Sequence, residues 1–274
     1  MTVHVRAAEA SDHPLFARLF PYLGTGDPVL EREAFVRQLL FTTLVAEVGA
    51  GNEAPSAVGY AYFQIIQELV YVRHVVTAPE VRRRGVGRAL LDAIAARARA
   101  AGCSVWCLNV LRDNTAALAL YEAHGMRRAH RSRLITVPWA AVDAHAAAPH
   151  KGLVARVIAP EDDARVEPAT DLVAGQLASH RALGDRVLMM LEEDGGVVGA
   201  TSFAPSFPGA YPFRVSRPAL ALVLLRALAP HARPGDAHLG VMTENQPEVA
   251  DALVSAGGTS KLDLVHMKGP VPPG

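Results

Sequence analysis

Hydrophobic residues recur along the chain at two different spacings, which predict strands alternating with helices. Residues 69–77 are rich in Val and Tyr, and they predict a buried strand that ends at the Ala78-Pro79 turn. Apolar residues then return at helical spacing from residue 85 or 86, and Gly102 predicts a left-handed cap at the end of that helix. The apolar face of the predicted helix consists of Leu90, Leu91, Ile94, Ala95 and Ala98.

Similar patterns predict the other elements of the first half. Ser11 and Asp12 precede a helix that runs through Phe20, and a second helix is expected near residues 30–40. Further strands are predicted at residues 3–7, 43–48, 58–66 and 134–137 and at the strand that carries Cys103 and Cys107. This order of elements indicates an α/β (α+β) fold.

The loop between the strand at 69–77 and the following helix predicts a site for a phosphate group. It points unpaired helix N–H groups and the positive end of the helix dipole at a ligand, while its arginines supply charge. Gly85 and Gly87 let a ligand approach the backbone closely. Taken alone, a solvated run of arginines is the more common explanation for such a loop. Two other phosphate loops are excluded, because Leu90 stands where a dinucleotide fingerprint needs Gly and no Gly-Lys-Ser/Thr occurs.

Length and composition fit a protein with more than one core. The chain has 274 residues, of which 50% are hydrophobic and 20% charged, enough for two ordinary domains. Its net charge is zero, so neither nucleic acid nor an anionic membrane is the expected partner. No apolar run reaches about 18 residues, and the first residues lack the layout of a signal peptide, which predicts a cytoplasmic protein.

The cysteines and histidines predict neither a disulfide nor a metal site. Cys103 and Cys107 would lie about 13 Å apart along one strand, too far to bridge. The eleven histidines are scattered along the chain, without metal-ligand spacing to the cysteines.

Two segments of the first half together resemble the GNAT superfamily of N-acetyltransferases. Arg82, Gly85 and Gly87 match its acetyl-coenzyme A loop, Arg/Gln-x-x-Gly-x-Gly/Ala, and residues 109–126 match its later strand and helix. The resemblance implies a mixed, mostly antiparallel twisted sheet flanked by helices, with acetyl-coenzyme A as co-substrate. It also implies that the backbone of the strand at 75–77 holds the pantetheine arm and polarises the acetyl carbonyl. The implied cofactor-binding residues are Val75, Val76, Thr77, Arg82, Arg83, Arg84, Gly85, Val86, Gly87, Arg88 and Asn114.

Tyr121 and His74 are the candidate catalytic residues. Asn114 and Tyr121 are seven residues apart and so share one helix face. The tyrosine pKa of about 10, above the thiol pKa of about 8.5, keeps the Tyr121 hydroxyl protonated at neutral pH, so it can hydrogen-bond or protonate a departing sulfur. His74 is the candidate general base for an incoming amine. For each residue considered alone, a packed core side chain is the more common explanation.

The second half repeats the first weakly, which predicts a tandem GNAT protein. The predicted domains are a catalytic domain at residues 1–137, a linker at 138–152 and a degenerate GNAT-like domain at 153–274. The second copy has no glycine in its counterpart of the phosphate loop, where Ser216 is expected to cap a helix. Either Leu253 or Val254 stands in place of Tyr121.

The predicted function is acetyl-coenzyme A-dependent N-acetylation of a small-molecule or protein amine. The segment at residues 20–27 is where acceptor contacts are expected. The alternative is a non-catalytic acyl-coenzyme A-binding sensor or interaction protein, which would keep the loop without needing Tyr121. Either a monomer or a homodimer is compatible with these features.

Overall fold

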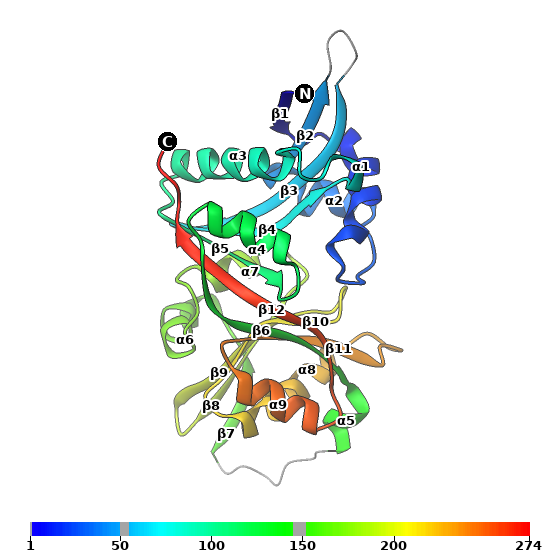
Figure 1. The fold of residues 1–274 in the computed structure, drawn as a ribbon. Coiled ribbons are helices and arrows are strands. Elements are labelled where there is room, and N and C mark those ends of the chain that lie inside the picture. The colour runs from blue at the N-terminus through cyan, green and yellow to red at the C-terminus, as the bar shows by residue number, and fades with distance from the viewer. Residues whose placement is uncertain (1, 50–54, 145–151) are drawn as a thin grey trace. The chain divides into compact units, whose positions relative to one another are not determined.

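The computed structural model describes residues 2–49, 55–144 and 152–274, which form two compact units. The first unit consists of Met1–Ala129 together with Met267–Gly274, and the second unit consists of His130–His266. Figure 1 shows the strands and helices of both units along the chain.

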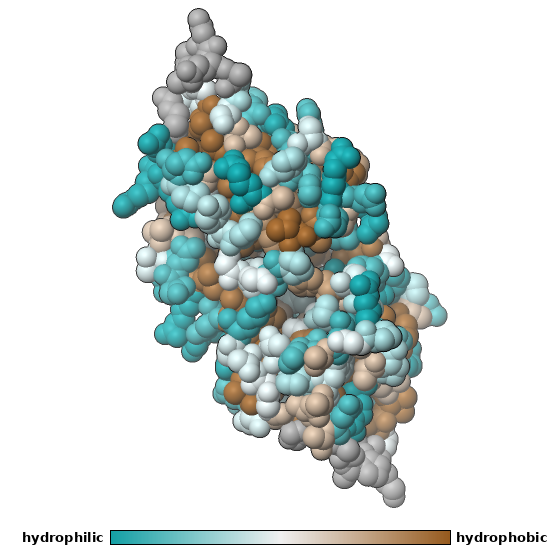
Figure 2. Space-filling view, turned by 90° about the vertical axis from the view of Figure 1, so that its right-hand side faces the viewer, coloured by the Kyte–Doolittle hydropathy of each residue, from teal (hydrophilic) through white to brown (hydrophobic). Residues whose placement is uncertain are grey.

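The surface mixes polar and apolar side chains. Figure 2 shows hydrophobic residues as several separate groups among hydrophilic ones on the visible face. Within the described ranges, no helix combines the length and apolar character that crossing a membrane requires.

A mixed, mostly antiparallel sheet forms the centre of the first unit. Its strand order is β1-β2-β3-β4-β5-β12, in which β1 to β4 are antiparallel neighbours and β4 pairs in parallel with β5. The strands are β1 (Thr2–Ala7), β2 (Thr43–Gly49), β3 (Ser56–Ile66), β4 (Leu69–Thr77), β5 (Val105–Leu111) and the last residues of β12 (Thr259–Pro270). The α-helices are α1 (His13–Leu19), α2 (Arg32–Gln38), α3 (Val86–Ala100) and α4 (Thr115–Ala123).

Helices cover both faces of this sheet. A Cβ added to Gly59 of β3 would lie 3.1 Å from Val86 Cγ1 of α3, so this position faces α3. The next residue, Tyr60, faces α1, with its ring 5.3 Å from the ring of Phe16. Because successive strand residues point to opposite faces, α3 and α1 lie on opposite sides of the sheet.

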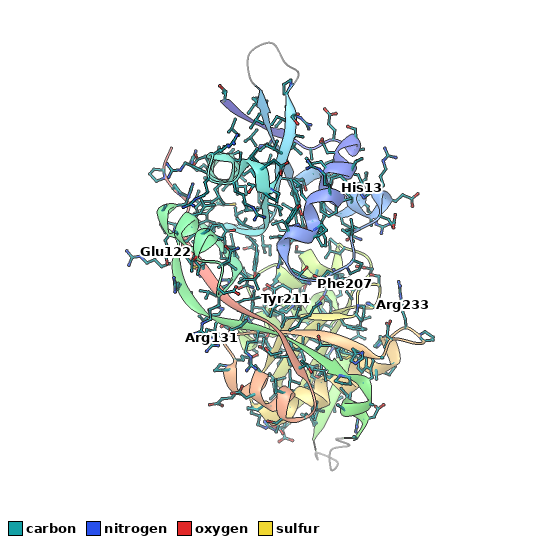
Figure 3. All side chains as sticks on the ribbon, turned by 45° about the vertical axis from the view of Figure 1, so that its right-hand side comes forward. His13, Glu122, Arg131, Phe207, Tyr211 and Arg233 are labelled. Atoms are coloured by element: carbon teal, nitrogen blue, oxygen red, sulfur yellow. The ribbon has the colours of Figure 1, made fainter. Side chains whose placement is uncertain are left out.

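The second unit repeats this layout. Its strand order is β12-β6-β11-β10-β9-β8-β7, with β10 and β11 parallel and the neighbouring pairs from β7 to β10 antiparallel. At one position Arg131 of β6, labelled in Figure 3, donates a hydrogen bond of 2.7 Å to Asp263 of β12. The strands are β6 (Arg127–Pro138), β7 (Leu153–Val157), β8 (Val187–Glu193), β9 (Gly196–Ala204), β10 (Gly209–Val215) and β11 (His238–Glu244). The α-helices are α5 (Trp139–Ala144), α6 (Asp163–Ala169), α7 (Gln176–Arg181), α8 (Ala221–Leu228) and α9 (Pro247–Ser255).

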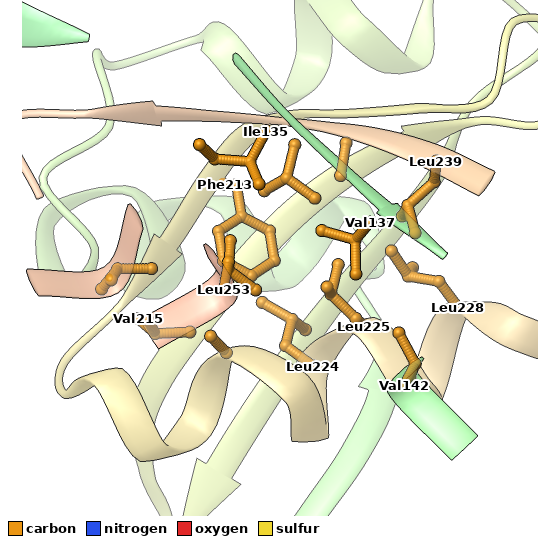
Figure 4. Packing of buried hydrophobic residues seen from close by; sticks show 14 of the residues in the cluster. Ile135, Val137, Val142, Phe213, Val215, Leu224, Leu225, Leu228, Leu239 and Leu253 are labelled. Carbon is orange, nitrogen blue, oxygen red and sulfur yellow. The ribbon is translucent and has the colours of Figure 1, made fainter. Parts of the chain in front are cut away.

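Alternating side chains of β8 divide the interior of the second unit into two clusters. Met189 belongs to the larger cluster, which packs against α8 and is drawn in Figure 4. Leu188 and Met190 point the other way, into a smaller cluster that contains Val166 of α6. The sheet is therefore buried on both faces, as the hydrophobic runs in its strands predict.

One ion-pair network occurs in both units and confirms the predicted tandem arrangement. In the first unit, Arg6 binds Asp12 at 2.7 Å through Nη1 and Glu47 at 2.7 Å through Nε. In the second unit, Arg156 binds Asp162 and Glu192 through the same two nitrogens, again at 2.7 Å. Matching strands, helices and ion pairs in both halves indicate two copies of one fold.

These networks favour the charged carboxylates. Burial on its own raises the pKa of Asp12, but hydrogen bonds from Arg6 and from the Glu9 N–H bring this pKa below its ordinary value. The pKa of Asp162 is also lowered, chiefly by the hydrogen bonds that it accepts from Arg156. Each aspartate therefore joins the first strand of its unit to the helical turn that follows.

Some local features differ from the sequence-based expectations. Residues 139–144, within the predicted linker, form α5, and Val142 is fully buried in the larger cluster of the second unit. The rest of that predicted linker, 145–151, lies outside the described residues. Cys103 precedes β5 rather than lying in it, and both cysteines are buried without a disulfide.

Candidate functional site

The parallel strands β4 and β5 separate partway along their length. Their pairing runs from Leu69 with Val105 to Val72 with Leu108, whereas β4 continues to Thr77. An irregularity in the β3–β4 register coincides with the separation, since Tyr62 pairs with His74 but Phe63 pairs with Val72. The extra residue, Arg73, forms a bulge of the kind that re-aims strands near functional sites.

The separation leaves one edge of β4 open over its last residues. The pairs of β3 with β4 continue from His74 to Thr77, so half of the backbone groups there are bonded to β3. The other half point away from β3, toward the side where β5 has diverged. Val75, Val76 and Thr77, predicted to hold the pantetheine arm, lie in this stretch. Their contact with a cofactor stays a prediction.

The loop after β4 brings the N-terminus of α3 to this open edge. A 3-10 turn at Pro79–Val81 is followed by Arg83 with φ of 63° and Gly85 with φ of 85°. Gly85 is the N-cap residue of α3, whose 15 residues make it the longest helix described. The first N–H groups of a helix have no intrahelical acceptor, so they favour an anion at this end.

The two loop glycines serve different purposes. A Cβ on Gly85 would meet no atom within 4 Å, so the left-handed φ, rather than crowding, is what favours glycine there. A Cβ on Gly87 would lie 3.1 Å from Leu120 Cδ2, so Gly87 permits close packing of α3 on α4. The space in front of Gly85 is open to a ligand.

The loop arginines are exposed, and one of them contacts the segment predicted to bind the acceptor. Arg82, Arg83, Arg84 and Arg88 are all exposed. The Arg82 guanidinium lies 5.4 Å from the centre of the Tyr22 ring, within the range of a cation–π contact. Tyr22 belongs to the 3-10 turn Phe20–Leu23, and sequence reasoning did not identify this contact.

Tyr121 lies on α4 and is 7% exposed. Burial raises the pKa of its hydroxyl above the ordinary value of about 10, so the hydroxyl is protonated at neutral pH. No described residue forms a hydrogen bond with that hydroxyl. Its proton is therefore available to a ligand, as the predicted proton donor requires.

Asn114 caps the helix that carries Tyr121. Its Oδ1 accepts a hydrogen bond of 3.1 Å from the Ala117 N–H, in the usual manner of an N-cap asparagine. Asn114 as a whole is exposed. A role in cofactor binding stays a prediction, but the cap gives Asn114 a structural role that the sequence analysis did not assign.

His74 sits among aromatic rings on the α1 face of the sheet. The rings of Phe20, Tyr60 and Tyr62 lie 5.3 to 5.9 Å from it, and its Nδ1 is 3.4 Å from the Tyr60 hydroxyl. Burial, followed by repulsion from Arg73, lowers the pKa of His74 to about 3. Neutral His74 can accept a hydrogen bond, but at neutral pH it is a weak base.

The corresponding strands of the second unit separate less. Pairing of β10 with β11 extends to Phe213 with Thr243, two residues before β10 ends at Val215. Gln246 Nε2 then donates a hydrogen bond of 2.8 Å to the Val215 carbonyl. The helical turn that follows begins at Pro218, and its N-cap residue is Arg217. The prediction that Ser216 caps this helix is therefore wrong.

The counterpart of Tyr121 in the second unit is Leu253. The Gly258 N–H donates to the Leu253 carbonyl, as the Met126 N–H does to the Tyr121 carbonyl. Leu253 is fully buried in the larger cluster of the second unit. Of the two positions that the sequence left open, the hydrogen bonds therefore select Leu253 over Val254.

Part of the chain matches a known protein family. The Acetyltransferase (GNAT) family profile matches residues 13–126, which include the loop, α3 and Tyr121. The chain therefore contains an acetyltransferase domain of the GNAT family.

Two proteins of known activity are similar in sequence to parts of this chain. A mycothiol acetyltransferase of Clavibacter sepedonicus is 51% identical over 55 residues, which are 20% of this chain but only 17% of that protein. A thialysine N-epsilon-acetyltransferase of Sus scrofa is 28% identical over 120 residues, covering 41% of this chain and 71% of that protein.

A solved structure extends the similarity to the whole chain. The tandem GNAT protein from the clavulanic acid biosynthesis pathway superposes with a TM-score of 0.63 at 17% identity, covering 100% of both chains. At that identity the likeness concerns the fold, which is two GNAT-like domains in tandem.

Proposed function

We propose that this protein is an acetyl-coenzyme A-dependent N-acetyltransferase whose chemistry takes place in the first unit. The observation that carries the proposal is the separation of β4 from β5 beside the N-terminus of α3. There the open edge of β4, the open space in front of Gly85 at the start of α3, and the Tyr121 hydroxyl on α4 belong to one unit. Acetyl-coenzyme A brings a thioester carbonyl, a pyrophosphate and a thiol leaving group, and the chain offers groups for each.

The pyrophosphate would lie at the N-terminus of α3. The free N–H groups of the first turn and the exposed Arg82, Arg83, Arg84 and Arg88 supply hydrogen bonds and positive charge. The backbone of residues 75–77 would hold the pantetheine arm along the open edge of β4. An N–H on that edge would polarise the acetyl carbonyl, where negative charge develops as the amine attacks.

In the reaction, a carbon–nitrogen bond forms at the carbonyl and the carbon–sulfur bond breaks. Tyr121 donates a hydrogen bond to the departing sulfur and shares its proton with it as negative charge develops there. Because a phenol is a weaker acid than a thiol, water completes the protonation of the released thiolate. The amine must lose a proton as well. The low pKa of His74 supports a role in which it accepts a hydrogen bond from a water molecule, and that water takes up the proton of the amine.

The second unit is proposed to be degenerate for this chemistry. Extended pairing of β10 with β11, the missing glycine before α8 and Leu253 in place of Tyr121 all support this proposal. The acceptor is proposed to be a primary amine on a small molecule or protein, taken in from the side of the 3-10 turn at Phe20–Leu23.

The proposal is tested by measuring thiol release from acetyl-coenzyme A with a panel of small primary amines and lysine-containing peptides. We expect Tyr121→Phe to lower kcat about 100-fold while the Kd for acetyl-coenzyme A changes less than twofold. The matched control is Tyr211→Phe, which removes a tyrosine hydroxyl from β10 in the second unit and should leave both values unchanged.

Calorimetry with acetyl-coenzyme A separates the competing functions. One site per chain with amine turnover fits the proposal, whereas one site without turnover for any amine would favour a non-catalytic acyl-coenzyme A sensor. Two sites per chain would contradict the degenerate second unit. No binding at all would refute the proposed acetyltransferase activity.

A further inference from the structure

The second unit contains a cavity on its α6 face that the proposed reaction does not use. Its volume is about 300 Å³, at the lower end of the range for small-molecule sites. The lining consists of residues 168–171, Val198, residues 214–216 and residues 244–246. It therefore lies between the end of α6 and the C-terminal ends of β10 and β11.

The place of this cavity within the repeated fold is defined by strand register. Val215 pairs with Gly199 in the second unit, as Thr77 pairs with Gly59 in the first. Arg214 therefore corresponds to Val76, which pairs with Tyr60 on the aromatic face. In the second unit a charged side chain occupies this place, beside Ala200.

Arg214 is held by one edge of its guanidinium. Its Nη2 donates to Glu244 Oε2 at 3.0 Å and its Nη1 donates to the Glu244 carbonyl at 3.3 Å. Glu244 is buried and also accepts a hydrogen bond of 3.4 Å from the hydroxyl of Tyr211, labelled in Figure 3. This buried pair fixes the plane of the guanidinium.

The other edge of the guanidinium is available. Arginine has five N–H donors in a rigid plane, and the Nε–H with the neighbouring Nη2–H forms a second fork that matches a carboxylate. Among the described residues, none accepts a hydrogen bond from Arg214 Nε. The Arg214 side chain is only 15% exposed, so an acceptor at this edge would add a hydrogen-bond partner to a mostly buried guanidinium.

Charge around the cavity restricts the ligand further. Arg214 and Glu244 cancel one another, and Asp171 in the lining adds one negative charge. This excess repels a purely anionic ligand, whereas a ligand that also carries an ammonium group can place a positive charge beside Asp171 and adds no net negative charge. Thr170, Ser216 and Asn245 add short polar side chains to the same lining.

We infer that the cavity of the second unit binds a free α-amino acid, with its carboxylate on the Nε edge of Arg214 and its ammonium group toward Asp171. This inference does not depend on the proposed acetyltransferase activity. It gives the second unit a binding function of its own.

The test is calorimetric titration of the full chain with each of the twenty common amino acids up to 10 mM. We expect at least one to bind, and we expect its carboxamide derivative, acetate and methylamine each to bind at least tenfold more weakly. Arg214→Lys keeps the charge beside Glu244 but loses the fork, so it should weaken binding at least tenfold. The matched control is Arg217→Lys, which changes an arginine that pairs with Glu193 outside the cavity and should leave the affinity unchanged.

Several results would overturn the inference. One is that no amino acid binds to the wild-type chain, and another is that binding is equally tight in Arg214→Lys, which would assign it to a different site. Binding of inorganic phosphate or acetyl-coenzyme A at Arg214, without any amino acid, would also contradict it. A thermal melt of each variant separates loss of the site from loss of the fold.

Discussion

At the scale of single residues, burial decides what two side chains of the candidate site can do. It keeps Tyr121 protonated, so the hydroxyl can donate a hydrogen bond, and it keeps His74 neutral, which weakens it as a base. Both residues carry the type of side chain that the chemistry needs. Burial raises the pKa of Tyr121 and lowers the pKa of His74, because in each residue it favours the uncharged form.

The lowered pKa of His74 predicts a pH-dependent stability. In the unfolded chain the pKa of a histidine is about 6.5, whereas the pKa of folded His74 is about 3. Between these two values the unfolded state binds a proton at His74 and the folded state does not. This contribution to stability is fully present above pH 6.5 and is lost as the pH falls, by up to about 1.4 kcal/mol per pH unit.

The measurement is the free energy of unfolding in urea between pH 7 and pH 5 for the wild type and for His74→Gln. We expect a shallower pH dependence in the variant, since the other histidines and the carboxylates titrate equally in both proteins. Equal slopes in the two proteins would show that folded His74 has an ordinary pKa.

At the scale of elements, the junction of β4, its loop and α3 depends on a left-handed residue before the helix. Gly85 at the start of α3 and Gly102 just after its end both have positive φ and open space at the Cβ position. The two positions differ in their surroundings, because only Gly85 lies in the proposed phosphate loop. Comparing substitutions at Gly85 and Gly102 therefore distinguishes the effect of backbone strain from an effect on ligand binding.

We predict that Gly85→Ala and Gly102→Ala each lower the free energy of unfolding by about 1 kcal/mol, the cost of an L-residue in the left-handed region. Gly85→Ala alone should weaken acetyl-coenzyme A binding, by at least tenfold, because its Cβ enters the space proposed for the pyrophosphate. Calorimetric titration of both variants checks this. Equal affinities would move the cofactor away from this loop.

At the scale of the whole molecule, the compact units are not two consecutive stretches of sequence. The first unit takes in Met267–Gly274, where the Val271 N–H donates to the Ser104 carbonyl and Arg99 Nη1 donates to the Pro272 carbonyl. The second unit takes in residues 130–138, where β6 pairs with β11. Each unit therefore needs a strand from the other half of the chain.

We predict that a fragment ending at residue 137 does not fold stably, because it lacks the strand beside β5. Circular dichroism and a thermal melt of residues 1–137 would check this, with the full chain as reference. A cooperative transition close to that of the full chain would show that the first half folds without residues 267–274.

A single substitution tests the same feature within the intact chain. A Cβ on Gly269 would lie 2.5 Å from the Gly125 carbonyl oxygen and 3.0 Å from Met126 Cα, and backbone atoms cannot move aside cheaply. We expect Gly269→Ala to cost about 2 kcal/mol of unfolding free energy, a typical value for overpacking. Gly49→Ala, where a Cβ meets nothing within 4 Å, is the matched control and should change it by less than about 0.5 kcal/mol.

Local features were predictable from the sequence because short-range sterics determine them. The strand at 69–77, the helix that begins at Val86 and the left-handed Gly85 follow from side-chain periodicity and backbone freedom over a few residues. The tandem fold was predictable for the same reason, because each half repeats the same local signals. The site residues themselves were proposed from a loop and a helix whose spacing is visible in the sequence.

Only the tertiary structure decided which distant segments meet. Periodicity reveals which face of a strand is buried but not which strand lies beside it, so neither the pairing of β6 with β11 nor the pairing of β12 with β5 could be inferred from the sequence. The low pKa of His74, the cap formed by Asn114 and the fork offered by Arg214 arise in the same way. Each depends on burial or on partners supplied by the folded chain, and no local pattern encodes those.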